Sequence, residues 1–394
     1  MTNVVQVIAL ISYAIVLAIY GLYVVLILRN AKSKEYIELI NQASMKSLNY
    51  QSLPNVTVIV PTYNEEAVIS KKLQNIAEFN YPIEKIDVLL LDDCSTDRTC
   101  EIAQNMFKKL GLRGKIIRNP NRMGVNASYN RGVPNASSSL ILRTDADVVI
   151  EADALERVVQ IISNIENVGG ITGTMTPVMD KTTAATKVEY TYRTLFDQMS
   201  TAESALHSTF LGGGGFALLK KSCFSPISPN HGSTDENILL SIIKKGFRYV
   251  YVPHTFSRET IPQRFNEQIT QKVRRASRLI QSTLMNKDIL FRREFEEFGT
   301  VIFPLRFAML AICPVLVVVG LISTFFLILS YSAVLALFLT FTCFLSISIG
   351  ARRNVRYLNS VTSFLIHQFY LLLGLLFLGK SWGTWKKIER LPAK

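Results

Sequence analysis

Short apolar runs alternate with polar turns and amphipathic stretches over the first part of the chain. Residues 54–61, 86–91 and 137–142 contain consecutive β-branched or aliphatic side chains, which is the pattern of buried strands. After the first two runs, residues 67–76 and 101–110 repeat apolar side chains at the three- and four-residue steps of a helix. Because strands that alternate with helices form parallel sheets covered by helices, the sequence predicts an α/β fold.

Longer uncharged runs lie toward both ends of the chain. Residues 7–28 are long enough to cross a bilayer and lack the basic leader and small-residue cleavage site of a signal peptide. Residues 307–351 are long enough for two spans with a turn near Ser330, and residues 357–379 are a candidate fourth span. We therefore expect about three to four transmembrane helices.

These patterns divide the chain into successive parts. In chain order, we expect an N-terminal transmembrane anchor (1–34), a polar linker or membrane-parallel helix (35–53), a catalytic domain (54–260), interfacial amphipathic helices (261–299) and a C-terminal transmembrane region (300–394).

Basic residues orient these parts relative to the membrane. Arg29 and Lys32 follow the first span, and positive residues favour the cytoplasmic side, so we expect a cytoplasmic catalytic domain. A complete fourth span would put the basic segment 382–390 outside, against that rule. Either residues 357–379 are re-entrant or interfacial, or a span between 303 and 330 is miscounted. The tryptophans and lysines of 382–390 are typical of an interface anchor, which favours a cytoplasmic C-terminus in an integral plasma-membrane protein.

Composition supports a membrane protein. Hydrophobic residues make up 49% of the 394 residues and the mean hydropathy is +0.24, above the norm for soluble chains. The net charge of +13 favours attraction to anionic lipids and nucleotide diphosphates. The basic residues concentrate beside apolar segments without a nucleic-acid motif, so we expect no nucleic-acid partner. The cysteines form no C-x-x-C pair and the histidines are scattered, so we expect no zinc site.

Acidic side chains follow the predicted strands. In R-T-D-A-D-V-V, Asp145 and Asp147 come directly after the third apolar run. Open α/β sheets bind ligands at the carboxyl ends of their strands, and hard divalent cations bridge carboxylates to phosphates. The pair therefore predicts a Mg²⁺ or Mn²⁺ site for a diphosphate. Asp92 and Asp93 follow the second run, where helix capping explains Asp97 but not two adjacent acids.

Four ordered motifs carry a resemblance to a known family. V-P-T-Y-N-E-E, L-L-L-D-D-C-S-T-D-R-T, N-R-M-G-V-N-A-S-Y-N-R-G and T-D-A-D, within residues 56–281, resemble family 2 glycosyltransferases. These have a GT-A fold with a Rossmann-like mixed sheet, and the likeness extends to the polysaccharide synthase and N-acetylglucosaminyltransferase-like group. The resemblance implies the following roles: Pro61, Tyr63 and Glu65 line the nucleotide pocket, Asp93 bonds the base, Asp145 lies near the ribose and Asp147 holds the metal.

The third motif departs from the family pattern. N-x-G-K usually places a lysine near the donor phosphates, whereas Val125 follows Gly124 here. Arg122 or Arg131 could supply this charge, or the metal could suffice.

Two later motifs concern the acceptor. The glycine run in F-L-G-G-G-G-F exposes backbone amides, and the resemblance makes it a wall of the acceptor pocket. In S-T-D-E-N-I-L-L, Asp235 and Glu236 begin a helix, where carboxylates also serve as caps. Inversion at an anomeric carbon needs a carboxylate that accepts the acceptor's proton. Alignment on Leu239 slightly favours Glu236 as this base over Asp235.

Residues 263–282 are expected to form a basic amphipathic helix at the membrane surface. Related synthases carry Q-x-x-R-W there, and this chain has Gln271, Arg274 and Arg275 without the tryptophan. In processive synthases that indole stacks on the polymer, so its absence favours single transfers. The arginines are expected to meet the donor diphosphate or a lipid phosphate, or else only lipid headgroups.

We therefore expect a membrane-embedded inverting glycosyltransferase that moves a sugar from a UDP- or GDP-sugar to a lipid or lipid-linked acceptor. The alternative is a processive polysaccharide synthase. A nucleotidyltransferase is disfavoured because the first loop lacks G-x-G-T, and a non-catalytic scaffold is disfavoured because every acidic motif is present.

Overall fold

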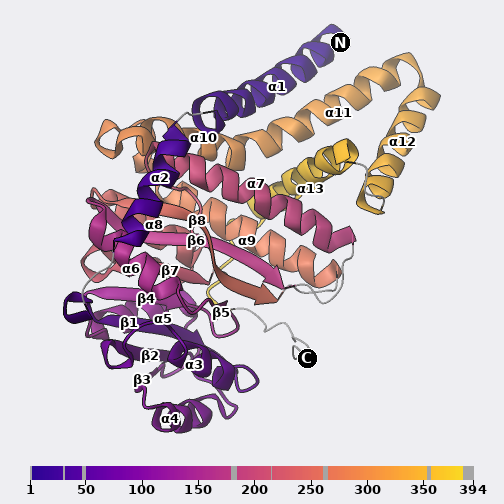
Figure 1. The fold of residues 1–394 in the computed structure, drawn as a ribbon. Coiled ribbons are helices and arrows are strands. Elements are labelled where there is room, and N and C mark those ends of the chain that lie inside the picture. The colour runs from indigo at the N-terminus through magenta and orange to yellow at the C-terminus, as the bar shows by residue number, and fades with distance from the viewer. Residues whose placement is uncertain are drawn as a thin grey trace.

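A computed structural model describes residues 2–29, 32–46, 50–178, 184–213, 215–260, 265–352 and 356–384. These residues contain one mixed sheet with the strand order β3-β2-β1-β4-β7-β6-β8-β5 (Figure 1). The strands are β1 (Val56–Thr62), β2 (Ile86–Asp92), β3 (Arg113–Arg118), β4 (Leu140–Thr144), β5 (Val149–Ile150), β6 (Val168–Val178), β7 (Phe216–Lys220) and β8 (Arg248–Thr260).

The first four strands in space form the predicted parallel half of the sheet. β1 pairs in parallel with β2 and β4, and β2 pairs in parallel with β3. β7 is antiparallel to β4 and β6, and β5 is antiparallel to β8, so the second half departs from the parallel pattern. Strands and helices continue to alternate along this part of the chain, and β6 pairs in parallel with β8, so the reversed direction of β7 is a tertiary feature that periodicity alone does not predict.

Helices cover both faces of the sheet. One face carries α2 (Lys32–Met45), α3 (Ile69–Ala77), α4 (Thr99–Leu110) and α6 (Ala154–Asn164); the other carries α5 (Val125–Gly132), α8 (Thr234–Lys244) and α9 (Phe265–Met285). In β1, Val58 and Val60 pack on the first face and Ile59 on the second. Each such side chain stabilises the fold by about 1.5–3 kcal/mol when fully buried.

The stretch that the sequence predicts as a linker or membrane-parallel helix contains α2, which packs on α6 and on α7 (Ala184–Leu206). Tyr36 and Ile40 join the core, and the Tyr36 hydroxyl donates to the carbonyl of Tyr251 at 2.7 Å. Residues 32–45 are thus packed against the sheet domain.

Apolar helices project from one side of the sheet domain (Figure 1). They are α1 (Thr2–Tyr23), α11 (Cys313–Tyr331) and α12 (Ala333–Arg352), and α1 packs along α11. The short α10 (Phe303–Phe307) precedes α11 and is packed into the core beside the sheet. Within the described ranges, two continuous helical stretches, Asn3–Leu28 and Phe298–Tyr331, are long and apolar enough to cross a membrane. The expected count of three to four spans is therefore not confirmed.

The last helix, α13 (Arg356–Leu376), lies along α9 and also packs against α1 and α11 (Figure 1). Gln368 of α13 donates to the Tyr20 hydroxyl of α1 at 2.8 Å. After α13, the chain returns to the sheet domain. Gln281 of α9 donates to the carbonyls of Leu378 and Lys380 at 2.7 and 3.0 Å. Trp382 donates its backbone N–H to the carbonyl of Asn230 at 3.3 Å. Trp385 and the basic residues after it lie outside the described residues.

Candidate active site

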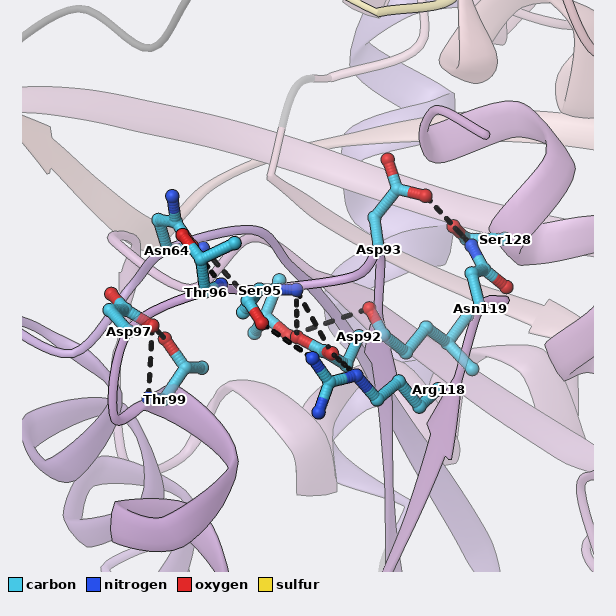
Figure 2. A network of polar contacts seen from close by, with 12 residues as sticks. Asn64, Asp92, Asp93, Ser95, Thr96, Asp97, Thr99, Arg118, Asn119 and Ser128 are labelled. Carbon is cyan, nitrogen blue, oxygen red and sulfur yellow. Dashed lines mark hydrogen bonds and ion pairs between the residues drawn. The ribbon is translucent and has the colours of Figure 1, made fainter. Parts of the chain in front are cut away.

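The loops that follow β1 and β2 are joined side by side (Figure 2). Asn64 donates its backbone N–H to Ser95 Oγ at 2.9 Å and accepts from the backbone N–H of Thr96 at 2.8 Å. The Glu65 N–H donates to Thr99 Oγ1 at 2.8 Å. Asn64 has a φ of 55°, a left-handed conformation that asparagine tolerates better than most residues. The first two motifs therefore form one rigid rim, with Pro61, Tyr63 and Glu65 partly exposed along it.

The three aspartates of the second motif have three different partners (Figure 2). Asp97 accepts from the backbone N–H of Thr99 at 3.0 Å at the start of α4, as helix capping predicts. Asp92 is fully buried, accepts from the Ser95 N–H at 3.2 Å and pairs with Arg118 Nε at 3.3 Å. Asp92 therefore fixes the turn itself.

Asp93 organises the third motif. Its carboxylate accepts from Asn119 Nδ2 at 2.8 Å, from the Met123 N–H at 2.7 Å and from the Gly124 N–H at 2.8 Å. Two of these bonds reach Oδ1 and one reaches Oδ2, so acceptor capacity remains for a nucleobase N–H. Gly124 has a φ of 88°, which favours glycine, and a Cβ there would lie 2.0 Å from the carbonyl oxygen of Gly383.

The two arginines that are candidates to replace the missing lysine lie in different places. The Arg122 guanidinium stacks over the ring of Tyr63 at 3.8 Å. Arg131 Nη1 donates to Asn119 Oδ1 at 2.5 Å, which is away from this ring. Arg122 is thus the better placed of the two to meet donor phosphates beside Tyr63.

The loop after β4 presents the D-x-D pair. Ala146 and Val148 point into the core, whereas Asp145 and Asp147 are partly exposed between them. Among the described residues, no group of three or more His, Cys, Asp and Glu side chains could hold a metal ion. Two carboxylates nevertheless fit a Mg²⁺ or Mn²⁺ ion, because such ions commonly take one or two carboxylates and complete their shell with substrate phosphates and water.

A buried lysine supports this loop. Lys72 of α3 is only 2% exposed, and its Nζ donates to Thr144 Oγ1 at 2.7 Å and to the Val148 carbonyl at 2.8 Å. Lys72 thereby joins the two ends of the segment that carries Asp145 and Asp147. Burial lowers the pKa of Lys72 to about 7, and the charge of Asp145 opposes this shift.

Lys72 should make stability depend on pH. Its folded-state pKa lies below the unfolded value, so the unfolded chain binds more protons between about pH 7 and pH 10. The free energy of unfolding should therefore rise with pH over this range, by at least about 1 kcal/mol between pH 7 and pH 9. Thermal unfolding should show this rise in the wild type and lose it in Lys72→Met. The exposed neighbour Lys71→Met should keep the rise, and an identical pH profile for both variants would contradict the assignment.

Arg143 joins the D-x-D loop to α8. It is buried in β4 and forms an ion pair with Asp235, whose side chain is 19% exposed. Burial would lower the pKa of Arg143, but the charge of Asp235 more than reverses this effect. Burial raises the pKa of Asp235, Arg143 opposes the rise, and the nearby charge of Asp145 adds to it. Asp145 and Asp235 therefore lie near the same guanidinium.

The glycine run packs directly against this pair. A Cβ at Gly212 would lie 2.7 Å from the Cβ of Asp235, so only glycine fits there without a shift of α8. The sequence predicts that these glycines let a substrate approach the backbone closely. At Gly212, however, the close neighbour is Asp235 of α8. Gly214 lies outside the described residues.

Glu236 has the sequence position of a helix-cap partner. Ser233 precedes α8 and Glu236 is its third residue, which is the spacing of the S-x-x-E capping box, but Ser233 makes no side-chain cap hydrogen bond and its backbone N–H donates to the Arg278 carbonyl at 3.2 Å and to Ser282 Oγ at 2.8 Å. The residue is 7% exposed, and burial together with Asp235 raises the pKa of Glu236 to about 7, while hydrogen bonds to Ser233 and to its own backbone oppose the rise.

The arginines of α9 lie beside these carboxylates. Arg278 is buried, donates to the Gly232 carbonyl at 2.9 Å and donates to Asn126 Oδ1 at 3.2 Å. The charge of Arg275 is near enough to lower the pKa of Asp235. Burial lowers the pKa of Arg274, and Arg278 and Arg275 add to this effect. The expected residues Arg274 and Arg275 therefore belong to one cationic cluster, with the partly exposed Gln271 one turn earlier on α9.

Asn126 links the nucleotide side to the acceptor side. It follows the Gly124 turn, donates from Nδ2 to the Ser228 carbonyl at 2.7 Å and accepts from Thr234 Oγ1 at 2.5 Å. Sequence reasoning assigned no role to Asn126, Lys72 or Arg143. Two signals were available, since Lys72 falls on the apolar face of its helix and Arg143 interrupts a buried strand.

Comparison with known proteins identifies the domain that carries these loops. Residues 57–225 match the model of the family described as glycosyl transferase family 2. An N-acetylglucosaminyltransferase from Rhizobium meliloti is 25% identical over 251 residues, covering 60% of this chain and 58% of that protein. This chain thus spans less than two thirds of that relative's length.

A second relative comes from Methanococcus voltae. It is a dolichyl N-acetyl-alpha-D-glucosaminyl phosphate 3-beta-D-2,3-diacetamido-2,3-dideoxy-beta-D-glucuronosyltransferase, 32% identical over 124 residues, covering 29% of this chain and 38% of that protein.

Among solved structures, the mannosyltransferase PcManGT from Pyrobaculum calidifontis, in complex with GDP-Man and Mn²⁺, superposes with a TM-score of 0.71. The superposition covers 94% of this chain and 98% of that one at 21% identity, so it shows a shared fold. The mixed α/β sheet expected from the family resemblance is confirmed.

Proposed function

Residues 57–225 belong to glycosyl transferase family 2, and from this premise we propose that the protein is a membrane-embedded, metal-dependent, inverting glycosyltransferase. It transfers a sugar from a UDP- or GDP-sugar to a lipid or lipid-linked acceptor. The observation that carries the proposal is the ion pair between Arg143 at the end of β4 and Asp235 at the start of α8, which brings α8 to the strand that leads into the D-x-D loop.

Donor binding is assigned to the first three motifs. Tyr63 and Arg122 provide a stacked surface, and Asp93 offers an acceptor for the N–H of uracil or guanine. Arg122, Arg274 and Arg275 supply positive charge for the diphosphate. When bound, a divalent cation at Asp147 and Asp145 stabilises the charge that develops on the departing diphosphate.

Transfer is assigned to α8. One of the two carboxylates at its start accepts the proton of the acceptor as the acceptor oxygen attacks. The neighbouring arginines of α9 attract an acceptor that carries phosphate. Two relatives fit this assignment, because the name of one specifies a dolichyl phosphate acceptor and the solved neighbour contains GDP-Man with Mn²⁺.

The decisive experiment offers purified protein in lipid a panel of radiolabelled UDP- and GDP-sugars with a total lipid extract. We expect one donor to give a labelled lipid that carries a single added sugar, and a chelator to abolish it. A ladder of products would instead support the processive synthase. Tight nucleotide binding without turnover of any donor would support a non-catalytic scaffold and contradict the proposal.

The return of residues 377–384 to the sheet domain supports a cytoplasmic C-terminus. If α1, α11 and α12 cross the membrane, α12 returns the chain to the cytoplasmic side, and α13, which contacts α9 as well as α1 and α11, leads back to the sheet domain. A reporter fused after Lys394 should then read cytoplasmic, and a reporter inserted after Tyr331, between α11 and α12, should read extracytoplasmic. An extracytoplasmic signal from both fusions would restore the fourth span.

A further inference from the structure

One buried carboxylate joins the membrane-side helices to the glycine run. Glu203, near the end of α7, is 0% exposed. Its Oε1 accepts from the Tyr23 hydroxyl at 2.8 Å and pairs with Arg306 Nε at 2.5 Å. Its Oε2 accepts from the Phe210 backbone N–H at 2.9 Å. A single side chain therefore contacts α1, α10 and the segment that leads into the glycines.

The segment after α7 is also held by β8, because Arg248 Nε donates to the His207 carbonyl at 2.7 Å and the Tyr249 N–H donates to Ser208 Oγ at 3.1 Å. Within the Phe210 turn itself, Glu203 Oε2 is the carboxylate oxygen that holds the backbone. The Thr209 N–H donates to the Tyr249 carbonyl at 3.0 Å, and the Phe210 ring packs on Phe303 with centroids 5.8 Å apart. Gly212, which lies against Asp235, is only two residues along the chain from the Glu203 contact at Phe210. A displaced Phe210 would therefore move Gly212 as well.

Folding stability alone does not account for the buried Glu203–Arg306 ion pair. A buried ion pair offsets its desolvation only when its geometry is good, and well-packed apolar side chains of similar volume often stabilise as much or more. Here the second carboxylate oxygen bonds a loop N–H, and hydrogen bonds to ionised groups are stronger than neutral ones. The carboxylate therefore fixes the position of a loop as well as neutralising Arg306.

We propose that Glu203 is a positioning residue that holds the glycine run against Asp235, and that Tyr23 of α1 and Arg306 of α10 support it. The N-terminal helix α1 then helps to position the acceptor site through Tyr23, in addition to anchoring the chain in the membrane. The catalytic consequence rests on the proposed function, whereas the structural link does not.

The test uses the full chain in lipid and the variant Tyr23→Phe, which removes one hydroxyl from the contact with Glu203. The matched control is Tyr13→Phe, whose hydroxyl lies 3.1 Å from Thr324 Oγ1 on α11 and is remote from the loop. Hydrogen exchange of residues 209–213 should be about 5- to 10-fold faster in Tyr23→Phe and unchanged in Tyr13→Phe.

The activity readout is the ratio of sugar transfer to acceptor-independent donor hydrolysis. We expect this ratio to fall about 5-fold in Tyr23→Phe and at least about 10-fold in Glu203→Gln, with nucleotide affinity unchanged. If Glu203→Gln fails to fold, Tyr23→Phe still decides.

Unchanged loop exchange in Tyr23→Phe would overturn the structural link. Faster exchange with an unchanged transfer-to-hydrolysis ratio would overturn the positioning role. A wild-type protein that turns over no donor would refute the proposed function and the catalytic role of Glu203 with it, and hydrogen exchange would still decide the structural link.

Discussion

Replacement of Asp147 by asparagine should lower metal-dependent transfer by at least about 100-fold. An amide presents one neutral oxygen where a hard cation needs an anionic ligand, so the cation would no longer be held against the diphosphate. Within the described residues, the site offers two carboxylates and no third acidic side chain to substitute. The loss should appear both in turnover and in the affinity for Mn²⁺ together with the nucleotide diphosphate.

A matched control separates this effect from a general loss of surface charge. Asp153 lies on the surface at the start of α6, where it pairs with Arg157 at 2.7 Å. Asp153→Asn should leave transfer within about 2-fold of wild type, because exposed ion pairs contribute little. If Asp147→Asn turns over donor at the wild-type rate with the same Mn²⁺ dependence, Asp147 is not a metal ligand.

Sequence periodicity located the strands that matter for the site. β1 and β2 begin and end within two residues of the apolar runs, and each is followed by the expected polar loop. β4 starts three residues later than its run, because Ser137 and Ser138 hydrogen-bond to side chains of β1 and β2 before pairing begins. Local patterns suffice here because the strand and its buried faces are encoded within a few residues.

The different roles of the adjacent acidic residues could not be predicted from local patterns. Asp92 and Asp93 are adjacent, yet one fixes its own turn with Arg118 and the other binds the backbone at Met123 and Gly124. These partners lie more than twenty residues away, and their contacts depend on how β3 and α5 pack. Residue patterns alone indicated a cluster, and only the family resemblance pointed to Asp93 as the acid that meets a ligand.

Glu203 shows the same limit over a longer distance. Its neighbours in the chain are small residues, which predicts a packed helix surface but not a buried charge. Its partners Tyr23 and Arg306 come from opposite ends of the chain. The expected count of three to four membrane spans is not confirmed, since two continuous helical stretches of the described residues are long and apolar enough, and the contact between α13 and α9 is a tertiary feature that hydropathy does not encode.

The comparison between Asp235→Asn and Glu236→Gln should separate the catalytic base from the helix cap. Alignment slightly favours Glu236, whereas the contacts favour Asp235. Asp235 faces Arg143 and the glycine run, and Glu236 folds back onto the start of its own helix. The pKa of Glu236 near 7 suits a base, so the arguments against it are its burial and its hydrogen bonds to Ser233 and to its own backbone.

We expect Asp235→Asn to lower transfer at least about 100-fold while nucleotide affinity stays within about 3-fold, because proton acceptance contributes only to the chemical step. The substitution also leaves Arg143 without its carboxylate partner, so Asp235→Glu serves as the control that keeps the charge. It should retain the fold and part of the activity. Loss of nucleotide binding in both variants would instead mean that Asp235 maintains the fold.

Glu236→Gln should change stability more than rate, with transfer within about 5-fold of wild type. The folded-state pKa of Glu236 lies above its ordinary value, so its contribution to stability is complete below about pH 4.5 and is lost as the pH rises through about 7. Thermal unfolding should show this loss in the wild type, and Glu236→Gln, which does not titrate, should lack it. A 100-fold loss of transfer in Glu236→Gln alongside an active Asp235→Asn would reverse the two roles and make Asp235 the structural partner of Arg143.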